Sequence, residues 1–221
     1  MYKVRICFEK QGYSKYISNL DLMRLFQRVF KIAKVDIAYS QGFNPHQKIS
    51  ISNPLPIGIS GSEEYMDIQV NSVPDYRNIV KSLNGVLPDG IKVLWASEPK
   101  EDLNLIKFAD YSVEFGVVNK LDNFTEYVNA LKEKDDIVVS KKSKKGIINV
   151  DIKPHIFSFE IIEGDGYVFK LHMLLETSDK FNLKPTAVID AFKKYIPGFV
   201  IDYYIINRNA LLKENMSKID R

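Results

Sequence analysis

The alternation of apolar and polar residues predicts a strand at the start of the chain and an amphipathic helix soon after it. Over residues 2–10, apolar side chains at even positions alternate with charged or small ones, which is the period of a strand with one buried face. Ser18 is placed to cap the helix that follows, and Asp21 adds an acidic residue to its first turn. Apolar residues then recur every three to four positions and predict the buried face: Leu22, Leu25, Phe26, Val29, Phe30 and Ala33.

The remaining pattern of the first half predicts three more strands and one more helix. Strands are expected at 49–52, 64–70 and 91–96, and a helix at 74–87. Glycines and prolines between 54 and 61 interrupt the pattern. The resulting order, β-α-β-β-α-β, is that of the ferredoxin-like unit, which we assign to residues 1–100.

The second half follows a similar order, with additional strands. The predicted helices and strands are 111–118, helix 122–132, 137–140, 146–152, 156–162, 167–176, helix 185–195 and 200–206. Residues 100–107 have neither period and mark the boundary between the halves. The sequence therefore predicts an α+β fold of two tandem ferredoxin-like (βαββαβ) units. The second unit, 108–212, is decorated with extra strands that include a basic hairpin, and the polar tail 213–221 is expected to fray.

Composition narrows the class of protein and its compartment. The single cysteine, Cys7, excludes an internal disulfide and a self-contained iron–sulfur cluster, and its place in a strand favours a small buried side chain. No apolar run reaches membrane-spanning length, and the charged N-terminus is unlike a signal peptide, so we expect a cytoplasmic protein without a membrane partner. The net charge is only +3, yet residues 1–62 contain nine Lys and Arg against three acidic residues. Such a local basic excess can attract a polyanion, or it can be solvated surface.

The segment 39–48 is unusually rich in functional side chains for a connector. Gly42 can adopt a positive φ, and the pair Asn44-Pro45 favours a turn. Phe43 and His46 lie in the same ten residues. Loops of this kind on a rigid framework often form sites, although a rigid connector with one surface histidine is the simpler interpretation.

Together, this loop and the predicted helix suggest an RNA site. Three cations of the helix, spaced i, i+4 and i+7, form one basic stripe, and aromatic rings beside cations suit the unstacked bases of single-stranded or looped RNA. The candidate substrate-binding residues are Arg24, Arg28, Lys31, Gln41, Phe43, Asn44, His46 and Lys48. The basic run 141–145 is either a phosphate clamp or a solvated turn.

A catalytic interpretation would centre on His46, whose imidazole titrates near neutral pH and could act as a general acid or base. No nucleophile elbow or phosphate-binding glycine loop accompanies it, and no histidine pair has the spacing of metal ligands. We therefore expect neither a metal nor another cofactor. His155 and His172 are expected to be structural.

Several segments resemble the radical-SAM-linked protein family, a domain of unknown function. They are Tyr16-Ile17-Ser18-Asn19-Leu20-Asp21, 39–46, 54–58, Glu64-Tyr65, 150–154, Lys184-Pro185 and Asn207-Arg208. Members of that family resemble either the C-terminal part of a radical SAM protein or a separate chain encoded beside one, so the resemblance implies a radical SAM enzyme as partner. Asn19 stands where the family usually has histidine, which weakens a two-histidine mechanism, and the chain lacks the three-cysteine motif of the radical enzyme.

The resemblance and the residues leave three hypotheses for function. The first is an accessory module, without activity of its own, that binds RNA or a ribosomal component and presents it to the radical SAM partner. The second is a metal-independent ribonuclease or transferase that uses His46. The third is a protein–protein adapter whose segment 39–58 docks the radical SAM chain.

Overall fold

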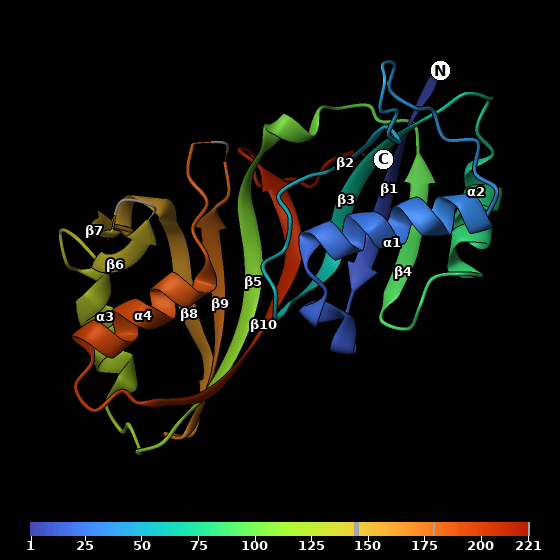
Figure 1. Cartoon of the computed structure of the whole chain (residues 1–221). Coiled ribbons are helices and arrows are strands. Elements are labelled where there is room, and N and C mark those ends of the chain that lie inside the picture. Colours follow the sequence, from blue (N-terminus) through green and yellow to red (C-terminus); the bar gives the residue numbers. More distant parts are fainter. Residues whose placement is uncertain (144–145, 179, 221) are drawn as a thin grey trace. The chain divides into compact units, whose positions relative to one another are not determined.

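The computed structural model describes residues 1–143, 146–178 and 180–220 (Figure 1). By its internal contacts the chain divides into two units, one of residues 1–106 with 208–221 and one of residues 107–207. Each unit is described by itself. Within the described residues, no helix is long and apolar enough to cross a membrane.

The first unit has the strand order of a ferredoxin-like sheet. Its helices and strands are β1 (Tyr2–Lys10), α1 (Asn19–Ile32), β2 (Ile49–Ile51), β3 (Ile59–Val70), α2 (Tyr76–Asn84) and β4 (Ile91–Ser97), with a 3-10 turn, η1, at Gly12–Tyr16. β3 and β4 flank β1, β2 pairs with the outer side of β3, and all of these pairs are antiparallel. From Arg208 on, β10 (Ile201–Lys213) also belongs to this unit and lies next to β3.

Both helices pack on one face of this sheet. Side chains of α1 meet those of β1 in a buried cluster, where the rings of Phe8 and Phe26 lie 5.1 Å apart. The predicted helix start is confirmed, because the Ser18 hydroxyl accepts a hydrogen bond from the Asp21 amide at 3.2 Å. Cys7 is fully buried, as predicted.

The second unit repeats the same order with an inserted hairpin. It contains β5 (Ile106–Val117), α3 (Phe124–Lys132), β6 (Val138–Ser143), β7 (Gly146–Asp151), β8 (Ile156–Gly164), β9 (Val168–Glu176) and α4 (Pro185–Tyr195), with the 3-10 turn η3 at Lys153–His155. The sheet order is β10-β5-β9-β8, and β6 and β7 form a separate two-stranded sheet. The α+β class is therefore confirmed, as are the two ferredoxin-like units and the extra strands of the second. Lys144 and Lys145, which belong to the predicted basic hairpin, lie outside the described residues.

Three strands are longer than the sequence pattern predicts. β3 begins at Ile59 and runs through Gly61, where a side chain would collide with the Glu64 carboxylate and with Leu55. The glycine is therefore required by close packing and does not end the strand. β5 begins at Ile106, after the 3-10 turn η2 (Leu103–Leu105), and β10 continues to Lys213.

Contrary to the expected fraying, residues 213–220 of the tail contact the first unit. The Lys213 ammonium donates to both carboxylate oxygens of Glu101, at 2.7 and 2.9 Å, and Lys218 pairs with Glu63 at 2.8 Å. The tail is polar in composition, but its two lysines have acidic partners, and Ile219, one of its two large apolar side chains, is buried.

Candidate functional site

Segment 39–48 of the first unit forms a short hairpin. Tyr39 and Gln47 make a β-bridge, and the Ser40 amide donates to the His46 carbonyl at 2.8 Å. Gly42 adopts φ +119° at the tip, a conformation that side-chain-bearing residues rarely reach. Phe43, the next residue, is fully exposed. The hairpin therefore holds an aromatic ring in solvent.

The Ser40 hydroxyl and the His46 imidazole hold the base of the hairpin together. The hydroxyl oxygen accepts the His46 backbone amide and also contacts the imidazole Nδ1, each at 3.0 Å, and Nδ1 lies 3.5 Å from the Asn44 carbonyl. These are contacts within the loop. A catalytic Ser–His pair needs a hydroxyl that points to its substrate and a third group that orients the base. Here the hydroxyl is engaged by the backbone, and among the described residues no carboxylate hydrogen-bonds to His46.

A buried glutamine joins the hairpin to α1. The Gln47 side-chain amide donates to the Gln27 carbonyl of α1 and to the Tyr39 hydroxyl, both at 3.3 Å. Gln27 follows Arg24 by three residues and precedes Lys31 by four, so these side chains are neighbours on the helix surface. The root of the hairpin therefore lies beside the basic stripe.

The cations of that stripe are exposed and only partly neutralised. Arg24 pairs with Asp21 at 3.3 Å, with both side chains more than half exposed, so the pair contributes little to stability. Arg28 and Lys31 are also exposed, and neither has an acidic partner in the described part of the chain. These two charges are available to a polyanion.

Lys48 does not join the other candidate residues. It precedes β2, where Ile49 faces the core, so alternation directs Lys48 to the opposite face of the sheet from α1. There its ammonium donates to the Gln69 side chain at 3.1 Å. The structure thus brings Gln41, Phe43, Asn44 and His46 together on the hairpin, next to the stripe of α1, and separates Lys48 from them.

A buried charged network holds the backbone at Asn53 and Ile17 of the first unit, and sequence reasoning missed it. The Arg208 guanidinium forms a two-point ion pair with Glu64 and also donates to the Asn53 carbonyl at 2.6 Å. The Lys10 ammonium donates to the Ile17 carbonyl at 2.7 Å. Burial raises the pKa of the Glu64 carboxyl, against the opposing effect of Arg208, and burial lowers the pKa of the Lys10 ammonium. The sequence placed Glu64 and Arg208 only in segments of the family resemblance, and nothing in their local pattern showed that they pair.

Apolar side chains are exposed near the same loops. The Gly58 amide donates to the Lys15 carbonyl at 2.9 Å and brings η1 next to the segment 54–58. Tyr13 is 94% exposed, Tyr16 60% and Ile57 62%. Exposed apolar groups that gather in one region often mark a binding surface.

The fold and this surface define an α+β protein of two ferredoxin-like units, in which the first displays an aromatic hairpin beside unneutralised cations. A family model described as an uncharacterized protein conserved in bacteria (DUF2344) matches residues 3–185, and the chain belongs to that family. No curated protein matches the chain.

Solved structures that align with this chain have little sequence identity with it. A chain in the crystal structure of a Cbf5-Nop10-Gar1 complex aligns with a TM-score of 0.56 and 10% identity, over 96% of this chain and 50% of that one. The present chain thus spans about half the length of that protein, and the likeness is one of fold. An unknown protein from Galdieria sulphuraria aligns over 94% of this chain and 98% of its own, at 12% identity and a TM-score of 0.28. The first two RRM domains of the yeast poly(U) binding protein Pub1 align over 93% and 99%, at 13% identity and a TM-score of 0.22.

Proposed function

We propose that this chain is an accessory module that binds RNA or a ribosomal component and presents it to a radical SAM enzyme. The observation that carries the proposal is the fully exposed Phe43, held on a hairpin whose root hydrogen-bonds to the helix that displays Arg28 and Lys31. A base can stack on the ring while the cations hold the adjoining phosphates. The radical SAM partner rests on the family resemblance of the sequence.

Specific substitutions test the RNA part of the proposal. Base–aromatic stacking contributes about 1–3 kcal/mol per base, so Phe43→Ala is expected to weaken the binding of single-stranded RNA roughly 5- to 150-fold. The double change Arg28→Ala and Lys31→Ala removes two phosphate contacts. It should reduce the slope of log K against log salt by about 0.7 for each contact that is lost. Fluorescence anisotropy of labelled single-stranded and looped RNAs at several salt concentrations measures both effects.

Lys92→Ala is the matched control. Lys92 is an exposed cation on β4 that alternates with core residues, so it lies on the sheet face opposite α1. Its loss changes the net charge by the same unit as Arg28→Ala but leaves the proposed surface intact. The RNA proposal would be refuted if Phe43→Ala and the double variant bind RNA as tightly as Lys92→Ala does.

A second candidate function, a protein–protein adapter, is favoured by the exposed side chains of Tyr13, Tyr16 and Ile57. Large apolar side chains of this kind suit a protein partner better than phosphate. In that case the chain should co-elute with a radical SAM protein of the same organism after nuclease treatment and in high salt. Tyr16→Ser together with Ile57→Ser should abolish the complex, whereas Phe43→Ala should leave it unchanged.

A further inference from the structure

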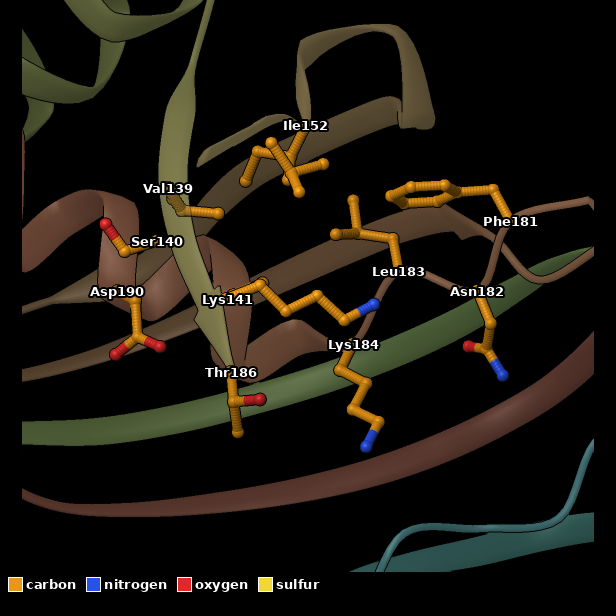
Figure 2. A pocket seen from close by; sticks show the side chains of 12 residues that line it. Val139, Ser140, Lys141, Ile152, Phe181, Asn182, Leu183, Lys184, Thr186 and Asp190 are labelled. Carbon is orange, nitrogen blue, oxygen red and sulfur yellow. The ribbon is translucent and has the colours of Figure 1, made fainter. Parts of the chain in front are cut away.

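The second unit contains a cavity that the proposed RNA surface does not use. It has a volume of about 320 Å³ and lies between β6, the end of β7 with Ile152, the segment 181–184 and the first turns of α4. Figure 2 shows the side chains that line it. Its volume is at the lower end of the range of small-molecule sites, about 300–1,000 Å³.

The floor of the cavity is apolar and well packed. Val139, Ile152 and Leu183 all line it, and each is at most 5% exposed. Because these side chains come from three separate segments that are each fixed in the core, the floor is already formed without a ligand. An apolar part of a ligand would be removed from water there.

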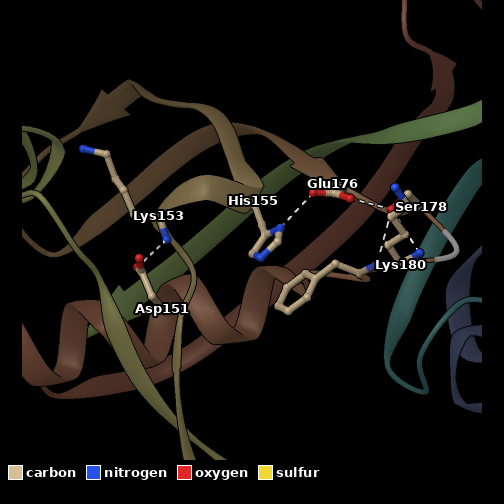
Figure 3. A network of polar contacts seen from close by, with 7 residues as sticks. Asp151, Lys153, His155, Glu176, Ser178 and Lys180 are labelled. Atoms are coloured by element: carbon tan, nitrogen blue, oxygen red, sulfur yellow. Dashed lines mark hydrogen bonds and ion pairs between the residues drawn. The ribbon is translucent and has the colours of Figure 1, made fainter.

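An aromatic side chain forms one wall, and a polar network holds it in place. The ring of Phe181 stacks on the His155 imidazole, with centroids 3.5 Å apart and planes 5° from parallel. His155 Nδ1 lies 2.7 Å from the Glu176 carboxylate, which also accepts from Ser178, as Figure 3 shows. The Ser178 hydroxyl in turn accepts the Phe181 amide at 3.3 Å. One face of the ring is thus occupied by histidine, and the ring is oriented before any ligand arrives.

The charge at the cavity is positive. Lys141 and Lys184 line it, both are exposed, and neither has an acidic partner in the described part of the chain. The one carboxylate of the lining, Asp190, pairs with Lys193 at 2.9 Å, and in Figure 2 the Lys141 side chain extends away from it. The Lys141 ammonium lies 5.8 Å from the centre of the Phe181 ring, a cation–π contact that a planar ligand would replace.

We propose that this cavity binds a nucleotide, with the base against Phe181 and the apolar floor and the phosphate between Lys141 and Lys184. The planar face of a base matches the aromatic wall, and an anionic group matches the two ammonium groups that have no acidic partner among the described residues. The side-chain amide of Asn182 also lines the cavity and can hydrogen-bond to the edge of a base. When the nucleotide binds, the Lys141 ammonium leaves the Phe181 ring and contacts the phosphate instead.

The same chemistry could come from a free nucleotide or from one nucleotide of an RNA strand, and calorimetric titration of the full chain distinguishes them. AMP, GMP, CMP and UMP form one set of probes, and a single-stranded oligoribonucleotide is the other. Inorganic phosphate and the matching nucleosides test the two halves of the site separately. Lys141→Ala and Lys184→Ala should each weaken binding about tenfold. Phe181→Leu, which keeps an apolar side chain but loses the ring, should weaken it fivefold or more.

Lys170→Ala is the control, since Lys170 is an exposed cation of β9 that pairs with Glu163 and is not part of the cavity. If mononucleotides bind the native chain and Lys170→Ala but not the cavity variants, the proposal is supported and the ligand is a free nucleotide. If only the oligoribonucleotide binds, and the same variants weaken its binding, the proposal is supported and the ligand is a nucleotide of an RNA strand. The proposal is overturned if neither probe binds at millimolar concentration, or if the lysine variants bind as the native chain does. Because Phe43 and Arg28 lie in the other unit, their variants should not affect mononucleotide binding, so this test and that of the RNA surface can fail separately.

Discussion

Removing one partner of the buried Glu64–Arg208 pair should destabilise the first unit strongly. The side chains are 2% and 1% exposed, and the guanidinium Nε donates to Glu64 Oε1 at 2.9 Å. In Glu64→Gln, the Arg208 cation remains buried near the Lys10 ammonium without a compensating charge. Loss of one partner from a buried ion pair costs about 3–5 kcal/mol. We expect a loss of this size in the free energy of unfolding.

Chemical denaturation monitored by tryptophan fluorescence measures this loss in the unit concerned. Trp95 is the only tryptophan of the chain, lies on β4 of the first unit, and has its ring 6.0 Å from that of Tyr65. With a urea m-value of about 2 kcal/mol/M, a loss of 3–5 kcal/mol lowers the midpoint by roughly 1.5–2.5 M. Arg24→Met is the control, because Arg24 forms an exposed pair whose loss should cost at most about 0.5 kcal/mol.

The double variant Glu64→Leu with Arg208→Met tests whether the cost comes from an uncompensated charge. Replacing both members of a buried pair by apolar residues is often close to neutral. The double variant should therefore lose less stability than the sum of the two single variants, by about 2 kcal/mol or more. Single losses under about 1 kcal/mol, or single losses that simply add in the double variant, would refute this account of the network.

Two further predictions concern backbone strain and pH. Gly90→Ala should lower the free energy of unfolding clearly more than Gly58→Ala. Both glycines have a positive φ, which costs a residue with a side chain about 1–2 kcal/mol. Only at Gly90 would the new Cβ also meet backbone, 2.5 Å from the Gln11 carbonyl oxygen. Equal losses in urea denaturation would contradict this. The hydrogen bond from Lys213 lowers the pKa of the Glu101 carboxyl. The stability that this interaction gives to the folded chain is therefore fully present above the ordinary carboxyl pKa and is lost as the pH falls through the lowered pKa. NMR signals of Lys213 and Asp220, which both contact Glu101, should shift in acid, and Glu101→Gln should give the same shift at pH 7. Signals that do not move in either case would show that Glu101 does not hold these residues.

Local periodicity was sufficient to predict most helices and strands, because each one has a buried face. The helix after Ser18 and the alternation of β1 are examples. The continuation of β10 to Lys213 could not be predicted in this way. Arg208 looks out of place in an apolar strand until its partner Glu64, 144 residues earlier in the chain, is known.

The candidate site was only partly predictable for the same reason. A ten-residue window contains the hairpin and its exposed ring, so composition and turn residues were enough to find it. Whether Lys48 shares a surface with Arg28 of α1 depends on which face of the sheet Lys48 points to, and one residue of register decides that. The cavity of the second unit is assembled from segments between residues 139 and 190. The basic run at Lys141 was noticed in the sequence, but its proximity to Phe181 and Lys184 depends on the fold.

The residues that carry the family resemblance fall into two physical groups. Glu64 and Arg208 are buried and tie β10 to β3, and Arg208 also holds the backbone of the loop at Asn53. Phe43 is fully exposed and contributes nothing to the core. A sequence pattern that includes both groups therefore specifies a framework and, separately, a surface displayed on it. It follows that Glu64 variants should be less stable and should lose RNA binding only to the extent that they unfold. Phe43→Ala, in contrast, should lose RNA binding while keeping the stability of the native chain.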